Sequence, residues 1–100
     1  MRVIFLRPAL RELNEAINYY ELQSQGLGSR FKTEIDLARK RIAAYPFAWP
    51  IEKADVRKCL LHKFPYKILY IVHDDQISVL AVAHQHREPD YWVRRRNLIE

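Results

Sequence analysis

Two apolar segments separated by a short acidic turn constrain the fold of this chain more than any other feature. Residues 66–73 are rich in Ile, Leu, Tyr and Val, residues 77–84 are almost entirely apolar, and Asp74-Asp75-Gln76 lies between them. Apolar segments of this length, joined by turn-forming residues, are typical of a β-hairpin. A strand without a polar face is usually covered on both sides, so residues 77–84 are predicted to form a central strand of a sheet.

Hydrophobic spacing in the first half of the chain predicts two amphipathic helices. Pro8 suits the first turn of the first helix, and Gly26 and Gly28 are expected to end it, because glycine adopts the left-handed conformation of a helix C-terminus. The second helix is expected to run from about Ser29 to the residue before Pro46. The apolar stripes are Leu10, Leu13, Ala16, Ile17 and Tyr20 in the first helix, and Phe31, Ile35, Ala38 and Ile42 in the second.

Short apolar segments at residues 2–6 and 56–61 predict two further strands, and the aromatic rings of Phe47 and Trp49 are expected to pack on the core. The order of elements is therefore β-α-α-β-β-β. It predicts one α+β domain over residues 1–100, with a helical hairpin packed on a mostly antiparallel four-stranded sheet. Residues 91–99 are expected to form either a short terminal helix or a frayed tail.

The charge and cysteine content limit the classes of function. Lys and Arg number 17 against 12 Asp and Glu, so the net charge is +5, which favours a polyanion or an acidic partner and is equally compatible with a well-solvated surface. Cys59 is the single cysteine, which excludes a disulfide within the chain and a CxxC metal site. No apolar run has the length of a signal peptide or a membrane span, so we expect a cytoplasmic protein without a membrane partner.

Chemically versatile side chains follow directly on the predicted central strand, at residues 84–92, where rigid scaffolds often present functional groups. His84 can serve as an acid or a base, or as a hydrogen-bonded structural residue. His84 and His86 share a face of an extended chain, but two ligands do not make a metal site, and no metal or cofactor is expected. Tyr91 and Trp92 are expected to pack on the sheet, and Arg94-Arg95-Arg96 is either a solvated run or a contact for nucleic acid or an acidic partner.

Short motifs from residue 19 to residue 92 occur in a recognisable order. They are Tyr19-Tyr20-Glu21, Gly26-Leu27-Gly28, Trp49-Pro50, Phe64-Pro65-Tyr66-Lys67-Ile68-Leu69-Tyr70, and residues 81–92 (Ala-Val-Ala-His-Gln-His-Arg-Glu-Pro-Asp-Tyr-Trp). In this order and at this chain length they resemble the RelE/ParE superfamily of bacterial type II toxins. The resemblance implies a compact toxin that a cognate antitoxin wraps and neutralises in a hetero-oligomer. RelE-like members cut mRNA in the ribosomal A site, whereas ParE-like members poison DNA gyrase and lack the ribonuclease residues, so the fold leaves the activity open.

The RelE-like alternative assigns catalytic roles to four residues. A metal-free ribonuclease needs a base for the 2′-hydroxyl, cations for the phosphate and an acid for the leaving oxygen. Arg87 and Tyr91 would hold the phosphate and donate the proton, and His84 would act as acid or base. His62 lies where the resemblance places a catalytic arginine, but histidine lacks the planar fork that grips phosphate.

The sequence therefore favours a ParE-like toxin that binds a cellular target such as DNA gyrase and is not an enzyme. A metal-independent, ribosome-dependent endoribonuclease that acts on mRNA is the alternative. A degenerate, non-toxic member that only binds antitoxin or nucleic acid is a further alternative.

Overall fold

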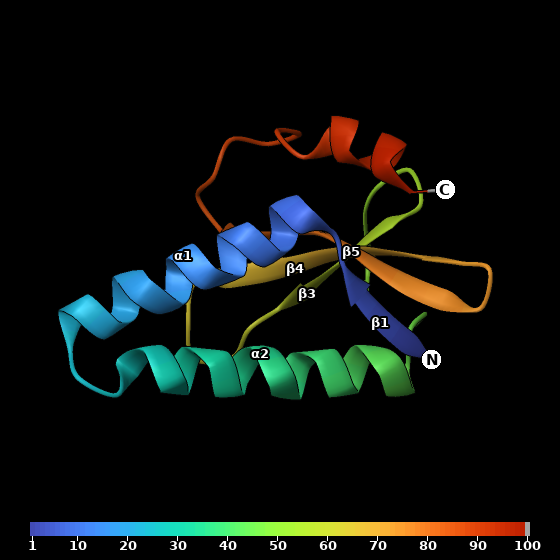
Figure 1. Ribbon diagram of the computed structural model, residues 1–100. Helices are drawn as coiled ribbons and strands as arrows, with labels where there is room; N and C mark the ends of the chain where they lie inside the picture. Colours follow the sequence, from blue (N-terminus) through green and yellow to red (C-terminus); the bar gives the residue numbers. More distant parts are fainter. Residues whose placement is uncertain (100) are drawn as a thin grey trace.

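The computed structural model describes residues 1–99 and confirms the α+β fold (Figure 1). Its sheet has five strands in the order β1-β5-β4-β3-β2, in which β1 runs parallel to β5 and the other neighbours are antiparallel. The extra strand is β2, whose three residues are too few to show an alternating pattern in the sequence. The elements are β1 (Arg2–Phe5), α1 (Arg7–Gln23), α2 (Leu27–Ala44), β2 (Ile51–Lys53), β3 (Val56–Leu60), β4 (Tyr66–His73), β5 (Gln76–His84) and the 3-10 helix η1 (Val93–Leu98).

The β4–β5 hairpin confirms the prediction from the apolar pattern. Asp74 and Asp75 both have left-handed φ angles, 47° and 59°, as the mirror-image turns of tight hairpins require. Tyr70 pairs with Val79 and Leu69 with Ala81, so Leu80 lies between them without a partner in β4. This extra residue is a β-bulge, which bends β5 where the candidate site begins.

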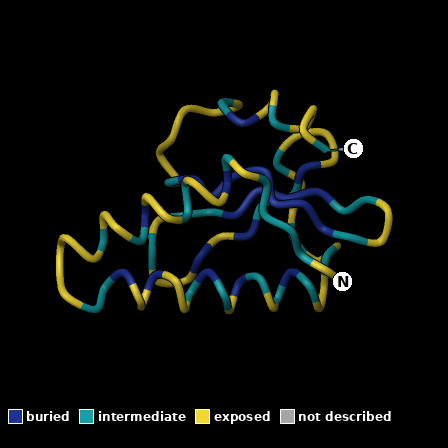
Figure 2. The backbone as a smooth tube through the Cα atoms, viewed as in Figure 1, coloured by how far each residue is buried: buried dark blue, intermediate teal, exposed yellow. Residues whose placement is uncertain are grey.

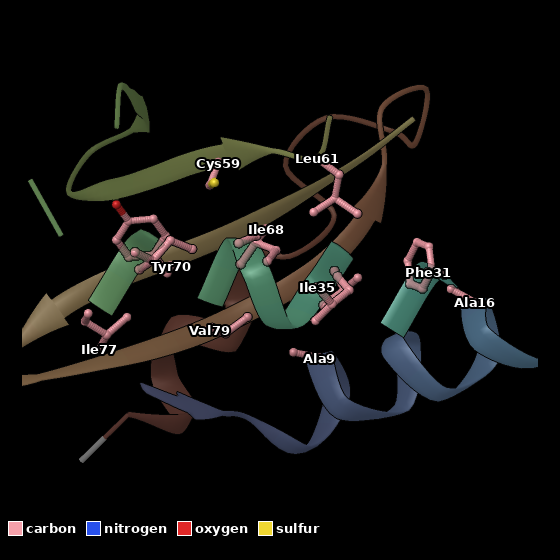
Figure 3. Close-up of a cluster of buried hydrophobic side chains, with 13 residues drawn as sticks. Ala9, Ala16, Phe31, Ile35, Cys59, Leu61, Ile68, Tyr70, Ile77 and Val79 are labelled. Carbon is pink, nitrogen blue, oxygen red and sulfur yellow. The ribbon is translucent and has the colours of Figure 1, made fainter. Parts of the chain in front are cut away.

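Both faces of the central strand are buried, as predicted. On one face α1 and α2 cover the sheet, and Figure 3 shows Ile35 of α2 facing Ile68 and Val79 of the strands and Phe31 beside Ala16 of α1. On the other face Trp92 packs in a second cluster, formed with Val56, Leu69, Ile71, Leu80 and Ala81. Figure 1 shows η1 and α2 on opposite sides of the sheet, so the terminal segment forms a third layer rather than a frayed tail.

The tip of the helical hairpin differs from the prediction. α1 ends at Gln23, and Gly26, with a φ of 86°, precedes α2 instead of ending α1. Gly28 lies within the first turn of α2, where a Cβ atom would be only 2.6 Å from the carbonyl oxygen of Ile17. The Glu21 carboxylate accepts the N–H groups of Gly26 and Gly28 at 2.9 and 3.0 Å and so caps α2. The two glycines therefore start α2 and let the helices approach closely.

Burial along the chain separates the framework from its exposed surfaces (Figure 2). The tip of the helical hairpin and the segment at residues 85–90 are largely exposed, whereas β5 is almost entirely buried. Trp49 packs against the core as expected, but the expectation is wrong for Phe47, whose ring is exposed. Within residues 1–99, no helix combines the length and apolarity needed to cross a membrane.

Candidate functional site

A carboxylate from α1 organises the region around residues 84–95. The Glu12 side chain is 12% exposed, and its Oε1 accepts hydrogen bonds from Arg95 Nη1 at 2.7 Å and from the N–H of Val82 at 3.0 Å. Its Oε2 accepts the Tyr91 hydroxyl at 2.7 Å and Arg95 Nη2 at 3.1 Å. One side chain thus joins the first helix, the central strand and the C-terminal segment.

This contact exists because β1 pairs with only the first half of β5. The pairing ends at Phe5 and Val79, after which the chain turns into α1. On the edge of β5 that β1 leaves open, the carbonyl of Leu80 accepts Arg95 Nη1 at 3.1 Å, and the N–H of Val82 donates to Glu12. Buried backbone groups need hydrogen-bond partners. At this part of β5, where β1 no longer pairs, the side chains of Glu12 and Arg95 are those partners.

Two guanidinium groups lie close to the ring of Tyr91. Arg87 Cζ is 4.0 Å and Arg95 Cζ is 4.9 Å from the ring centroid, which is the range of cation–π contacts. Burial, followed by the hydrogen bond to Glu12 and the charge of that carboxylate, raises the pKa of Tyr91 above its ordinary value of 10.0. The Tyr91 hydroxyl is therefore held neutral and already donates its proton to Glu12.

A hollow of about 230 Å³ lies between α1 and the ends of β4 and β5. The rings of His84 and Tyr66 meet edge to face there with centroids 5.3 Å apart, and His84 Nδ1 accepts the N–H of His86 at 3.1 Å. His84 therefore contacts the Tyr66 ring and the backbone of His86, as a structural residue would. The hollow combines acidic, aromatic and basic side chains, and its lining includes Glu12, Glu15, Tyr19, Tyr66, His84 and Arg87.

His62 lies apart from this group. Its side chain is exposed and lines a separate hollow of about 280 Å³ at the outer edge of β3. The structure thus brings Arg87 and His84 together in one hollow, places Tyr91 beside Arg87, and puts His62 elsewhere. Within residues 1–99, the His, Cys, Asp and Glu side chains form no group of three that is able to hold a metal ion.

Glu12 and Arg95 are the two site residues that sequence reasoning missed. Glu12 lies on the buried face of α1, three residues after Ala9 and four before Ala16, and a charged residue on an apolar stripe was the available signal. Arg95 is 19% exposed, so the interpretation of residues 94–96 as a solvated run is wrong for it. Arg96 hydrogen-bonds Asp55 and lowers the pKa of that carboxyl, whereas Arg94 is exposed.

The raised pKa of Tyr91 predicts a loss of stability in alkali. Above pH 10 the folded state keeps a proton that the unfolded state releases, so the free energy of unfolding falls with pH, by up to about 1.4 kcal/mol per pH unit for one proton. We expect Tyr91→Phe to flatten this decline, and Tyr45→Phe, at an exposed position, to leave it unchanged. Urea unfolding at several alkaline pH values measures both slopes, and equal slopes in the two variants would contradict the prediction.

The comparisons with known proteins agree with the fold and cover part of this site. A family model described as "ParE toxin of type II toxin-antitoxin system, parDE" matches residues 3–89. A solved chain of the chromosomal ParDE TA system from P. aeruginosa has a TM-score of 0.62 and 16% identity, covering 84% of this chain and 95% of that one. A search of curated proteins finds no match. The matched segment includes Glu12, His84 and Arg87 and ends just before Tyr91 and Arg95.

Proposed function

We propose a function from one premise: the chain belongs to the ParE toxin family of type II toxin-antitoxin systems, whose model covers residues 3–89. On this premise the protein inhibits growth by binding a cellular target, for which DNA gyrase is our candidate. A cognate antitoxin neutralises it in a hetero-oligomeric complex. The solved ParDE chain supports the fold of this proposal.

The arrangement around Glu12 favours a binding toxin over a ribonuclease. An RNA-cutting site needs a base, an acid and cations that converge on one phosphate. Here the Tyr91 hydroxyl donates to Glu12, Arg95 is occupied by the same carboxylate, and His62 lines a different hollow. Arg87 Nη1 lies 3.9 Å from Glu12 Oε2, so a phosphate bound to Arg87 would also meet a carboxylate. The proposal is supported by the observation that Tyr91 and Arg95 bind Glu12 and thereby hold the C-terminal segment against α1.

The exposed apolar side chains of the helical hairpin are our candidate contact for the antitoxin. Leu22 is 87% exposed at the end of α1, one turn after exposed Tyr19, which lines the hollow beside His84. Burial of such side chains would supply affinity, while the net charge of +5 favours an acidic partner and faster encounter. The association rate with the antitoxin should therefore fall as salt rises, and a salt-independent rate would contradict the electrostatic part.

Expression in bacteria tests the proposal directly. The chain alone should stop growth, and co-expression of the antitoxin encoded beside it should restore growth. If gyrase is the target, cells should form filaments and induce the SOS response while protein synthesis continues at first. Inhibition of supercoiling by purified gyrase is the matching measurement in vitro.

Two results would contradict this assignment. Cleavage of mRNA within codons that disappears in the Arg87→Ala, Tyr91→Phe double variant would establish the RelE-like ribonuclease, because a lost transition-state contact costs about a hundredfold in rate. Normal growth at high levels of folded chain without antitoxin would leave the non-toxic, degenerate member.

A further inference from the structure

The outer edge of β3 is uncovered beyond the end of β2. The N–H of Lys58 points outward to the carbonyl of Pro50 at 3.0 Å, and the N–H of Leu61 points inward to Tyr66 at 2.9 Å. Because antiparallel strands alternate, the backbone groups of Leu60 must point outward. The N–H of Leu60 meets no acceptor within residues 1–99, and its carbonyl meets only the Cys59 thiol, at 3.9 Å. This short edge is a template for a strand from another chain.

An apolar hollow with basic residues at its rim lies at the same edge. It has a volume of about 280 Å³ and is lined by Trp49, Pro50 and Leu60, which is 48% exposed, and by the basic side chains of Lys58 and His62. No acidic side chain within residues 1–99 lines it, although Glu52 lies close by, with its Oε1 3.4 Å from Lys58 Nζ. The hollow therefore fits an apolar side chain that is followed or preceded by a carboxylate.

The loop beside the hollow is held in place before any partner arrives. Arg57 Nη1 donates to the carbonyls of Trp49 at 2.7 Å and Phe47 at 3.2 Å. The buried Tyr70 hydroxyl donates to the carbonyl of Pro46 at 2.6 Å. A surface that is ordered in advance loses less conformational entropy on binding.

We infer that the β3 edge at Leu60 binds an extended, acidic segment of the antitoxin as an added strand. The inference rests on the proposed function, since it needs an antitoxin. Main-chain hydrogen bonds to Leu60 supply affinity, the hollow receives an apolar side chain, and Lys58 and His62 receive a carboxylate. The net charge of +5 disfavours a second copy of the chain at this edge and favours a partner of opposite charge.

The test measures the dissociation constant of the purified neighbouring antitoxin for four forms of the full toxin. Leu60→Pro removes the outward N–H, and proline is tolerated where a strand edge faces solvent. We expect it to weaken binding about tenfold at low and at high salt, as the loss of one main-chain hydrogen bond implies. His62→Glu should weaken binding about fivefold at low salt and much less at high salt. Lys40→Glu changes the charge by −2, against −1 for His62→Glu, but on the exposed side of α2, so its affinity should stay within about twofold of the wild type.

The possible outcomes separate this inference from the proposed function. Equal affinities of wild type, Leu60→Pro and His62→Glu would overturn the strand addition and leave the toxin-antitoxin function intact. A wild-type chain without affinity for the antitoxin would overturn both. Loss of growth inhibition with unchanged antitoxin affinity would assign the edge to the cellular target and overturn the inference. Thermal unfolding shows whether Leu60→Pro folds, and if it does not, His62→Glu decides alone.

Discussion

Replacing Glu12 with alanine is expected to lower the free energy of unfolding by about 3–4 kcal/mol, the usual cost of removing one partner of a buried ion pair. The change leaves the Arg95 guanidinium, the Tyr91 hydroxyl and the N–H of Val82 without their acceptor in one partly buried region. In a domain of this size a loss of 1 kcal/mol lowers Tm by about 4–8 °C, so the effect is large. Urea unfolding followed by tryptophan fluorescence measures it.

Matched variants separate the role of Glu12 from a general effect of removing a carboxylate. Glu15→Ala, at an exposed position on the same helix, should change stability by less than about 0.5 kcal/mol. Adding Arg95→Met to Glu12→Ala should recover part of the loss, because the buried cation is then removed as well. A Glu12→Ala loss no greater than that of Glu15→Ala would contradict the role assigned to Glu12.

Gly28→Ala is expected to cost about 2–3 kcal/mol by overpacking the contact between α1 and α2. The new Cβ atom would meet the backbone oxygen of Ile17 at 2.6 Å and Glu21 Oε1 at 2.9 Å. The Ile17 oxygen belongs to a helix and cannot rotate away, so the two helices must separate and the carboxylate cap of α2 must shift. Alanine ordinarily stabilises a helix by about 1 kcal/mol relative to glycine. A measured loss of stability would therefore show that the steric clash outweighs this gain.

Ser29→Ala is the control for the Gly28 variant. Ser29 is the exposed neighbour in the same helical turn, and its replacement should be neutral or slightly stabilising. Thermal unfolding of the two variants compares the positions. A Gly28→Ala chain as stable as the wild type would show that the two helices adjust without cost.

Local sequence patterns predicted most of the framework. The apolar segments at 66–73 and 77–84 became β4 and β5, and the residue before Pro46 ends α2 as expected. The errors arose where the pattern was short or ambiguous. β2 has three residues, and Gly28 serves close packing, which glycine satisfies as readily as it satisfies a turn.

The candidate site was predictable only in part, for the same reason. His84, Arg87 and Tyr91 stand out because they are near one another in the chain and follow a buried strand. His62 was grouped with them through the resemblance to the toxin superfamily, and the structure places it at the outer edge of β3. The order of motifs along a sequence does not determine where each side chain lies in the folded structure.

The sequence by itself determined most of the elements, the central position of residues 77–84 and the stretch of functional side chains after them. These depend on hydrophobic periodicity and chain adjacency, which are local properties. Only the tertiary structure decided that Glu12 binds Tyr91 and Arg95, which are 79 and 83 residues away along the chain. The reason is that the pairing of β1 with β5 ends at Val79, which leaves backbone N–H and C=O groups of β5 without a strand partner. The side chains that tertiary packing brings to that edge then form the missing hydrogen bonds.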